Sequence, residues 1–186
     1  LNSAEHFLAQ AGIAKAGLVL VPGNVMMATD VIDYILKQVE PKFLVIDAQF
    51  YPRVEKVFKD NKLNVGVTIP IGGGVIPGSV SFKDFINGKS KEEPNVTIHG
   101  DDILQIMYTS GTTAWPRGVM LSHIYMYWVS IGHAMTMSRG AGVLTEWDYK
   151  TGNYYPIFHI AAQGMVWSAL MIGGSSLIAR MPDPKI

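Results

Sequence analysis

Apolar residues recur at helical spacing twice in the first part of the chain. Positions 7, 8, 11 and 14 are apolar and follow the pair Asn2 and Glu5, which has capping-box spacing. A second apolar set, at positions 31, 32, 35, 36 and 39, follows Thr29 and Asp30 and ends before Pro41. We expect two helices here, the first capped by Asn2 and the second capped by Thr29 or Asp30.

Short apolar runs alternate with the helical stretches. Strands are predicted at 18–21, 43–46, 65–69, 103–107 and 119–121, with a further helix around 54–59. Ser122 is positioned to cap a helix that runs past Trp128, and the apolar run 164–179 predicts a buried helix followed by a strand. Such alternation is typical of an α/β fold, with mixed, largely parallel sheets flanked by helices.

Residues 70–94 interrupt this pattern with Gly, Pro, Ser and Lys. We interpret the stretch as a surface excursion that contains a short helix at 82–86. Its glycine triplet, Gly72 to Gly74, could cradle a phosphate, but no strand-to-helix context supports that role and a loop is the better interpretation.

Composition narrows the classes of function. The chain has 186 residues, of which 48% are hydrophobic and 16% are charged, so it is long and apolar enough to bury a core. Fifteen basic residues balance fifteen acidic ones without a basic run, which argues against a nucleic-acid partner. The absence of cysteine excludes disulfides, thiolate zinc sites and a cysteine nucleophile, and fits a cytoplasmic protein.

Neither a membrane span nor a signal peptide is predicted. The run 164–179 is broken by glycine and serine and is shorter than the roughly 20 residues that a spanning helix needs. A peripheral contact with a membrane stays open, as does assembly into a homo-oligomer. The chain starts without methionine, directly at a helix cap, which suggests a piece of a longer protein.

The stretch 108–119, Tyr-Thr-Ser-Gly-Thr-Thr-Ala-Trp-Pro-Arg-Gly-Val, has the residue types that bind a polyphosphate. Four hydroxyl side chains offer donors, Gly111 and Gly118 let backbone N–H groups turn toward one point, and Arg117 supplies a permanent charge. The common P-loop is excluded because no Gly-Lys-Ser/Thr triplet follows. A solvated turn between two strands is the alternative.

The same stretch resembles the signature loop of the adenylate-forming superfamily, which includes acyl-CoA synthetases, luciferases and peptide-synthetase adenylation domains. That loop reads Tyr/Phe-Thr-Ser-Gly-Thr/Ser-Thr-Gly-x-Pro-Lys-Gly-Val, and this chain departs from it at Ala114 and Arg117. Ala114 takes positive φ less easily than glycine, and Arg117 is bulkier and more planar than lysine. The resemblance implies the first part of a large N-terminal AMP-binding domain over residues 1–186, with the C-terminal domain absent.

A second similarity lies at 155–160, which resembles the Pro-x-Phe-His segment of acyl- and aryl-CoA ligases. A histidine among apolar residues is more often a satisfied core residue. Its place after the loop favours His159 as a functional group between the nucleotide and the acyl pocket. The stretch from His159 to Trp167 is then expected to line the pocket entrance, with small Ala161 and Ala162 leaving room for a bulky apolar acid.

The resemblance implies a reaction and a set of site residues. The enzyme would activate a carboxylic acid with ATP as an acyl adenylate and transfer it to coenzyme A, with Mg²⁺ as cofactor. The expected catalytic residues are Arg117 and His159, and the expected acyl pocket contains His159, Ala162 and Gln163. Thr109 is the expected metal contact. The expected ATP contacts are Thr109, Ser110, Gly111, Thr112, Thr113, Ala114, Arg117 and Gly118.

Two other functions stay open at this point. A peptide-synthetase type of adenylation domain is less favoured, because positions 160–162 offer no Asp for an amino group. A non-catalytic fragment is the other, because the chain lacks later elements of the family's site. Asp101 and Asp102 predict a turn rather than a metal pair, and the histidines at 6, 99, 123 and 133 lack zinc spacing.

Overall fold

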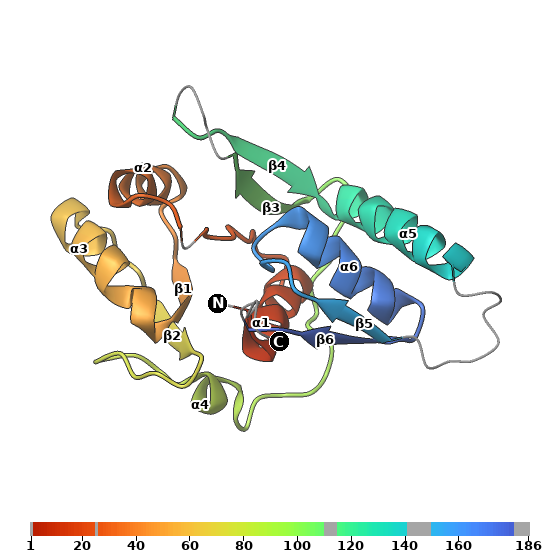
Figure 1. Ribbon diagram of the computed structural model, residues 1–186. Helices are drawn as coiled ribbons and strands as arrows, with labels where there is room; N and C mark the ends of the chain where they lie inside the picture. The colour runs from red at the N-terminus through yellow and green to blue at the C-terminus, as the bar shows by residue number, and fades with distance from the viewer. Residues whose placement is uncertain (1, 25, 110–114, 141–149, 181–186) are drawn as a thin grey trace, which may run out of the picture.

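Helices and short strands alternate along the chain in the computed structural model, which describes residues 2–24, 26–109, 115–140 and 150–180 (Figure 1). The elements are α1 (Ala4–Lys15), α2 (Thr29–Val39), β1 (Phe43–Asp47), η1 (Ala48–Phe50), α3 (Tyr51–Asn61), β2 (Val67–Ile71), α4 (Phe82–Ile86), β3 (Ile103–Tyr108), β4 (Gly118–Ser122), α5 (His123–Gly140), β5 (Lys150–Asn153), α6 (Ile160–Met171) and β6 (Ser175–Ile178).

The described strands pair two by two. β1 pairs with β2 and β5 with β6 in parallel, whereas β3 and β4 form an antiparallel hairpin. Each parallel pair is joined through a helix, α3 in the first case and α6 in the second, as parallel strands require a crossover. The expected α/β class with mixed, largely parallel sheets is confirmed.

Helices α2 and α3 lie side by side next to β1 and β2 (Figure 1). Their apolar faces contribute the buried side chains Ile35, Val54 and Val57. Asn61 at the end of α3 donates from Nδ2 to Asp33 on α2 over 2.6 Å. Helix α2 is therefore fixed to α3 and, through α3, to the first parallel pair.

Helix α1 lies between the two parallel pairs and touches both. Glu5 accepts a hydrogen bond from the backbone N–H of Gly72, which follows β2, over 3.0 Å. On the other side, the ring of Phe7 packs against Trp167 of α6 with ring centroids 4.7 Å apart. Phe7 belongs to the core cluster that also contains Ile157, Ala162 and Val166.

Helices α5 and α6 pack closely, and Gly164 makes the approach possible. A Cβ atom at this position would lie 2.9 Å from Nδ1 of His133 and 3.1 Å from a methyl group of Val129. His133 itself is held by a 2.9 Å hydrogen bond between Nδ1 and the carbonyl of Val129. The absent side chain lets α6 pack closely against α5, the helix that follows β4.

The helix caps differ from the prediction at two of three positions. Ser3, not Asn2, caps α1, because its Oγ accepts the N–H of His6 over 3.1 Å. Thr29 is already the first residue of α2, which has Ala28 at the cap and no side-chain cap bond. The Ser122 cap is confirmed, since its Oγ accepts the N–H of Tyr125.

The strands also depart from their predicted extents. Residues 18–21 form a single bridge, in which Leu20 exchanges two backbone hydrogen bonds with residues Leu104 and Ile106 of β3. Strand β2 starts two residues later than expected and includes Pro70 and Ile71. Gly66 instead binds the carbonyl of Lys42. The glycines Gly72 and Gly73 that follow have positive φ and form a turn.

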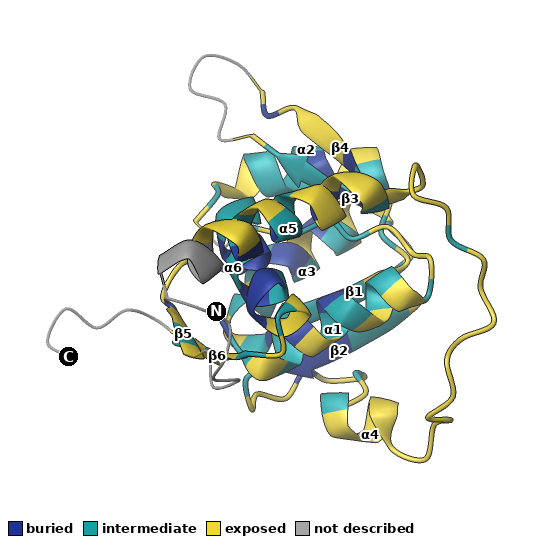
Figure 2. Ribbon diagram, turned by 90° about the vertical axis from the view of Figure 1, so that its right-hand side faces the viewer, coloured by how far each residue is buried: buried dark blue, intermediate teal, exposed yellow. Residues whose placement is uncertain are grey.

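Most residues after this turn are exposed until β3 begins (Figure 2). The short helix α4 at 82–86 is present and is capped by Ser81, whose Oγ accepts the N–H of Asp84. Ile76 is the buried exception, at 3% exposure. Asp102 forms the expected turn before β3, since its carboxylate accepts the N–H of His99 over 2.7 Å.

Candidate functional site

The β3–β4 hairpin carries the hydroxyl-rich stretch at its end. Tyr108 pairs with Gly118 in the ladder. Beyond this pair, the N–H of Thr109 donates to the carbonyl of Arg117 over 3.0 Å, and the N–H of Arg117 donates to Oγ1 of Thr109 over 3.2 Å. These two bonds close the base of the loop. Ser110, Gly111, Thr112, Thr113 and Ala114 lie outside the described residues.

Gly118, the first residue of β4, is required by packing. A Cβ atom there would lie 2.8 Å from the Cγ2 of Ile106 and 3.2 Å from the Cζ of Tyr108. The 2.8 Å contact is too short for a real Cβ atom, so any substitution would force Ile106 to shift and would also crowd the Tyr108 ring. Gly118 thus sets the position of Tyr108, the residue that leads into the loop.

Arg117 is the permanent charge at this end of the hairpin. The residue is exposed, and its guanidinium forms no ion pair or hydrogen bond with any part of the chain that the structure describes. A guanidinium without an internal acceptor retains five N–H donors for an external anion. Hydrogen bonds with Thr109 fix the backbone of Arg117, so the charged side chain starts from a fixed position at the base of the loop.

Helix α2 contacts both sides of the loop, which the sequence did not reveal. The hydroxyl of Tyr108 donates to Oε1 of Gln38 over 2.8 Å, and Nε2 of Gln38 donates to the hydroxyl of Tyr34 over 3.1 Å. The ring of Tyr34 lies against Trp115, with centroids 5.0 Å apart and an angle of 32° between the planes. Burial of the hydroxyl, with a smaller contribution from Tyr34, raises the pKa of Tyr108 above its usual value of 10.0.

His159 caps helix α6. Its Nδ1 accepts the N–H of Ala161 over 3.4 Å, a long bond, and its own N–H donates to the carbonyl of Pro156 over 2.9 Å. An accepting Nδ1 places the proton of the neutral ring on Nε2. The residue is exposed. The imidazole therefore stands at a helix N-terminus with Nε2 directed away from the cap bond.

The segment before His159 is held by buried amide side chains. Asn2 accepts the N–H of Ile157 over 2.9 Å and donates from Nδ2 to the carbonyls of Tyr155 and Ala179, over 2.9 and 3.0 Å. The carbonyl of Ile157 in turn accepts from Gln10 at 3.0 Å and from Gln163 at 3.2 Å. Asn2 and the two glutamines are at most 6% exposed.

Ala162 and Gln163 lie inside the molecule. Ala162 is 0% exposed and belongs to the core cluster, and its carbonyl accepts from Asn153 over 3.1 Å. Gln163 is 2% exposed. His159 is the exposed residue at this end of α6, whereas Ala162 and Gln163 pack on the buried side of the helix. Their role in an acyl pocket stays a prediction.

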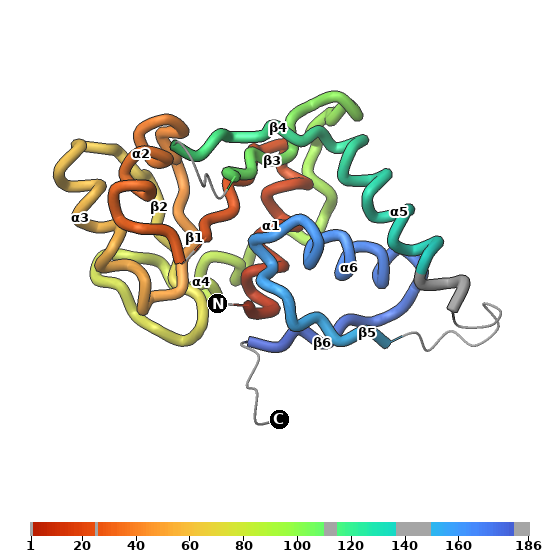
Figure 3. Tube along the Cα trace, turned by 45° about the horizontal axis from the view of Figure 1, so that its top comes forward, coloured from red at the N-terminus to blue at the C-terminus, as the bar shows by residue number. Residues whose placement is uncertain are grey.

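The two candidate groups, the hairpin end and His159, stand on separate elements. They share one neighbour, α5, which follows β4 directly and packs along α6. Figure 3 shows the course of the chain from the hairpin through α5 to α6. The segment before His159 is held by buried hydrogen bonds, whereas the hairpin end is held by exposed ones.

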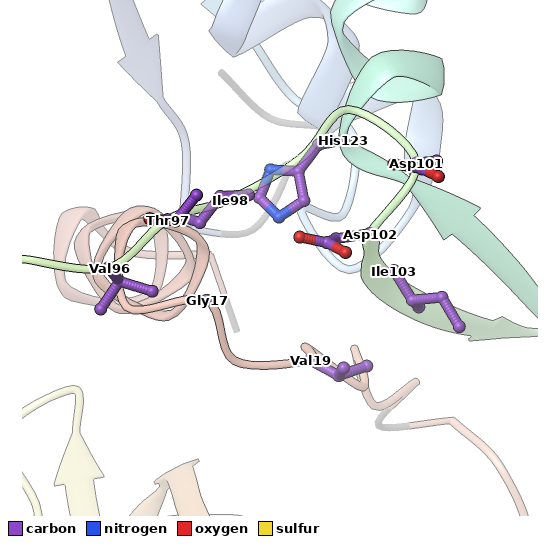
Figure 4. Close-up of a pocket in the computed structure, with 9 residues that line it drawn as sticks. All are labelled: Gly17, Val19, Val96, Thr97, Ile98, Asp101, Asp102, Ile103 and His123. Carbon is purple, nitrogen blue, oxygen red and sulfur yellow. The ribbon is translucent and has the colours of Figure 1, made fainter.

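A cavity of about 490 Å³ lies at the other end of β3. Figure 4 shows Asp101, Asp102 and Ile103 on the segment that enters β3, with His123 at the start of α5. The loop leaves β3 after Tyr108, a strand length of roughly 16–20 Å away at the usual rise per residue. This cavity is therefore separate from the candidate phosphate site.

Within the ranges that the structure describes, no group of three or more His, Asp or Glu residues is arranged to hold a metal ion. Nor does any described helix combine the length and the apolar character that crossing a membrane requires. Among the described residues, the hairpin end carries the Thr109 hydroxyl and the Arg117 guanidinium, which both suit contact with an anion.

Comparison with known proteins agrees with this chemistry. The model of a family described as AMP-binding enzyme matches residues 1–186. The chain belongs to this family. Crotonobetaine/carnitine–CoA ligase of Salmonella paratyphi B is 26% identical over 187 residues, covering 95% of this chain and 34% of the relative. The chain spans about a third of the length of the curated relatives it matches.

Solved structures show the same fold. The inhibitor-bound N-terminal domain of FACL13 from Mycobacterium tuberculosis is 28% identical with a TM-score of 0.76, and the match covers 98% of this chain and 43% of that chain. An anthranilate CoA ligase in complex with anthranoyl-AMP is 24% identical with a TM-score of 0.82, over 100% of this chain and 35% of that one. The chain thus has the fold of the N-terminal part of adenylate-forming enzymes.

Proposed function

We propose that this chain is the phosphate-binding part of an acid–thiol ligase, which activates a carboxylic acid with ATP and transfers the acyl group to coenzyme A. The observation that carries the proposal is the closed hairpin end, where Thr109 and Arg117 hydrogen-bond each other while the guanidinium of Arg117 has no partner among the residues that the structure describes. The match to the AMP-binding family over residues 1–186 supports it.

The proposed reaction has two steps. A carboxylate oxygen of the acid attacks the α-phosphorus of ATP, the bond between the α- and β-phosphates breaks, and pyrophosphate leaves. The thiol sulfur of coenzyme A then attacks the acyl carbon, its proton is released, and AMP leaves. Both steps need the reactants aligned and the departing charge stabilised, which positioned donors provide.

Arg117 is the residue that we assign to the departing charge. Its planar fork matches phosphate oxygens, and its backbone is anchored to Thr109, so little reorganisation is needed when pyrophosphate forms. The stretch 110–114 would add hydroxyl and backbone donors. Gly118 would let the chain approach the phosphates closely.

Mg²⁺ would neutralise phosphate charge when it is bound together with ATP. The donor set fits such an ion at Thr109, because hydroxyl oxygen is a hard ligand of the type that Mg²⁺ takes and only one of its two lone pairs is used, by Arg117. Thr109 would then hold the ion together with substrate phosphates, as is usual where a protein supplies few ligands.

The acid is proposed to lie at the exposed N-terminal end of α6. His159 would contact it through Nε2, and Ala162 and Gln163 would shape this end from the interior. The relatives named above act on carnitine-type and aromatic acids, and a bulky acid larger than acetate is the proposed class for this chain. ATP and coenzyme A as co-substrates favour the cytoplasm as the place of the reaction.

ATP–pyrophosphate exchange in the whole protein that carries these residues tests the proposal. We expect exchange only when a suitable carboxylic acid is present, and we expect coenzyme A to convert the product to a thioester. Exchange that requires an amino acid and gives no coenzyme A thioester would favour an adenylation domain instead. Absence of exchange with aliphatic, aromatic and betaine-type acids alike would contradict the proposal.

A further inference from the structure

Tyr108 and Trp115, which stand on either side of the segment 109–114, are both tied to one helix. Tyr108 precedes the segment and Trp115 follows it. Tyr108 is hydrogen-bonded to Gln38, and Trp115 lies against the ring of Tyr34. Gln38 also binds the hydroxyl of Tyr34, so the four side chains form a continuous chain of contacts. We call these four residues the α2 bracket.

The two bracket residues on α2 belong to a helix that is itself held in place. Tyr34 and Gln38 are four residues apart and therefore lie on one face of α2. Helix α2 is fixed to α3 through the bond from Asn61 to Asp33. Fixing an exposed tryptophan side chain in one conformation costs conformational entropy. The contact with the ring of Tyr34 offsets this cost for Trp115. Trp115 remains 55% exposed, so the core does not hold it in place.

We propose that Tyr34 and Trp115 are positioning residues for the hairpin end, where Thr109 and Arg117 are hydrogen-bonded to each other at the proposed phosphate site. The ring contact fixes the chain two residues before Arg117, and the bond between Tyr108 and Gln38 fixes it one residue before Thr109. The bracket thus orders the two ends of the loop before ATP arrives. This inference rests on the proposed function, because it assigns the ordered loop to ATP.

Loss of the bracket should act on ATP and not on the other substrates. If the hairpin end around Thr109 and Arg117 is not held in place in advance, ATP binding must order it, which consumes part of the binding free energy. We expect Trp115→Leu and Tyr34→Leu each to raise the KM for ATP in the exchange reaction by about threefold to tenfold. The KM for the acid and the conversion of supplied acyl adenylate to thioester should change by less than about twofold, because neither involves the phosphate loop.

Three further variants separate positioning from general stability. Trp115→Phe keeps a ring on Tyr34 and should restore most of the ATP affinity. The double variant Tyr34→Leu with Trp115→Leu should raise the KM for ATP no more than either single variant does, because each single substitution already removes the whole ring contact. The matched control pair is Tyr127 and Trp128 of α5, whose rings are 5.8 Å apart and exposed. Trp128→Leu should leave the KM for ATP unchanged.

Amide hydrogen exchange measures how well the bracket orders the hairpin end, and it does not require catalysis. The N–H groups of Thr109 and Arg117 are hydrogen-bonded in the structure, and both should exchange faster in Trp115→Leu but not in Trp128→Leu. Equal ATP KM values and equal exchange rates in wild type and Trp115→Leu would overturn the inference. If the wild type itself shows no ATP–pyrophosphate exchange, the proposed function fails, and amide exchange alone decides whether the bracket orders the hairpin end.

Discussion

At the scale of single residues, buried amide side chains fix the segment that leads to His159. Asn2 alone makes three hydrogen bonds to the backbone of residues 155, 157 and 179. Each bond satisfies a backbone group that has no strand partner at that point, and an unsatisfied buried group is costly. The position of His159 thus depends on a residue more than 150 positions earlier in the chain.

Asn2→Ala should lower the free energy of unfolding by roughly 2–3 kcal/mol, because it leaves the N–H of Ile157 and two carbonyls without this partner. Denaturant unfolding measures the change. Asn95→Ala is the matched control, since Asn95 is exposed, and it should change stability by less than about 0.5 kcal/mol. Equal effects of the two substitutions would contradict the assigned role of Asn2.

Tyr108 gives a pH-dependent signature of the bracket. Its folded pKa is raised above 10.0 by burial of the hydroxyl and by Tyr34, so the folded state keeps the proton to higher pH than the unfolded state. The resulting stabilisation is present below the unfolded pKa and is lost as pH rises through the folded pKa. The tyrosinate absorbance of wild type minus Tyr108→Phe should titrate above pH 10. A midpoint at or below 10 would show that the hydroxyl is solvated.

The sequence identified some of these residues and missed others for a physical reason. Arg117 and His159 stand within local patterns that have a chemical meaning of their own. Tyr34 and Gln38 have no such pattern, because Trp115 and Tyr108 lie far away in the chain and only the tertiary fold brings these residues together. Asn2 was predicted as a helix cap because it starts a capping-box spacing, yet its amide binds distant backbone groups and Ser3 caps the helix.

At the scale of elements, the contact between α5 and α6 depends on one glycine. Gly164→Ala should lower the free energy of unfolding by about 1–3 kcal/mol, because the added Cβ would meet His133 at 2.9 Å and its imidazole is tied to Val129. Gly132→Ala is the matched control on α5, where a Cβ meets nothing within 4 Å. It should raise stability by roughly 0.5–1 kcal/mol through helix propensity. Thermal or denaturant unfolding of both variants checks the opposite signs.

Helices with a clear apolar face were predictable, whereas short strands were less so. The set of apolar positions between 31 and 39 matches α2 closely, because helical periodicity alone specifies it. The apolar run 18–21 forms only one bridge, since strand formation requires a partner that the sequence does not display. Likewise β2 extends to Ile71 because its register follows β1, where Phe43 pairs with Val67.

At the scale of the molecule, two long-range contacts tie the first parallel pair to segments far away in the chain. Glu5 of α1 binds the turn after β2, and Arg180, just after β6, lies 3.4 Å from the carboxylate of Asp47 at the end of β1. The side chain of Arg180 is 55% exposed, so this ion pair contributes little stability on its own. It shows, however, that the ends of β1 and β6 lie close together.

The central claim is that the end of the β3–β4 hairpin binds the phosphates of ATP and that Arg117 stabilises pyrophosphate as it leaves. Loss of one preorganised charged donor from such a transition state costs roughly 10²- to 10³-fold in rate. Thiol attack on a finished acyl adenylate involves no pyrophosphate, so the two half-reactions should separate. Arg117→Lys keeps a positive charge and should retain much of the first one.

The most direct test measures both half-reactions of Arg117→Ala in the whole protein. ATP–pyrophosphate exchange should fall by about 10²- to 10³-fold, while supplied acyl adenylate is converted to thioester at nearly the wild-type rate. Exchange at the wild-type rate would contradict the account, because the guanidinium of Arg117 would then have no part in binding the phosphates.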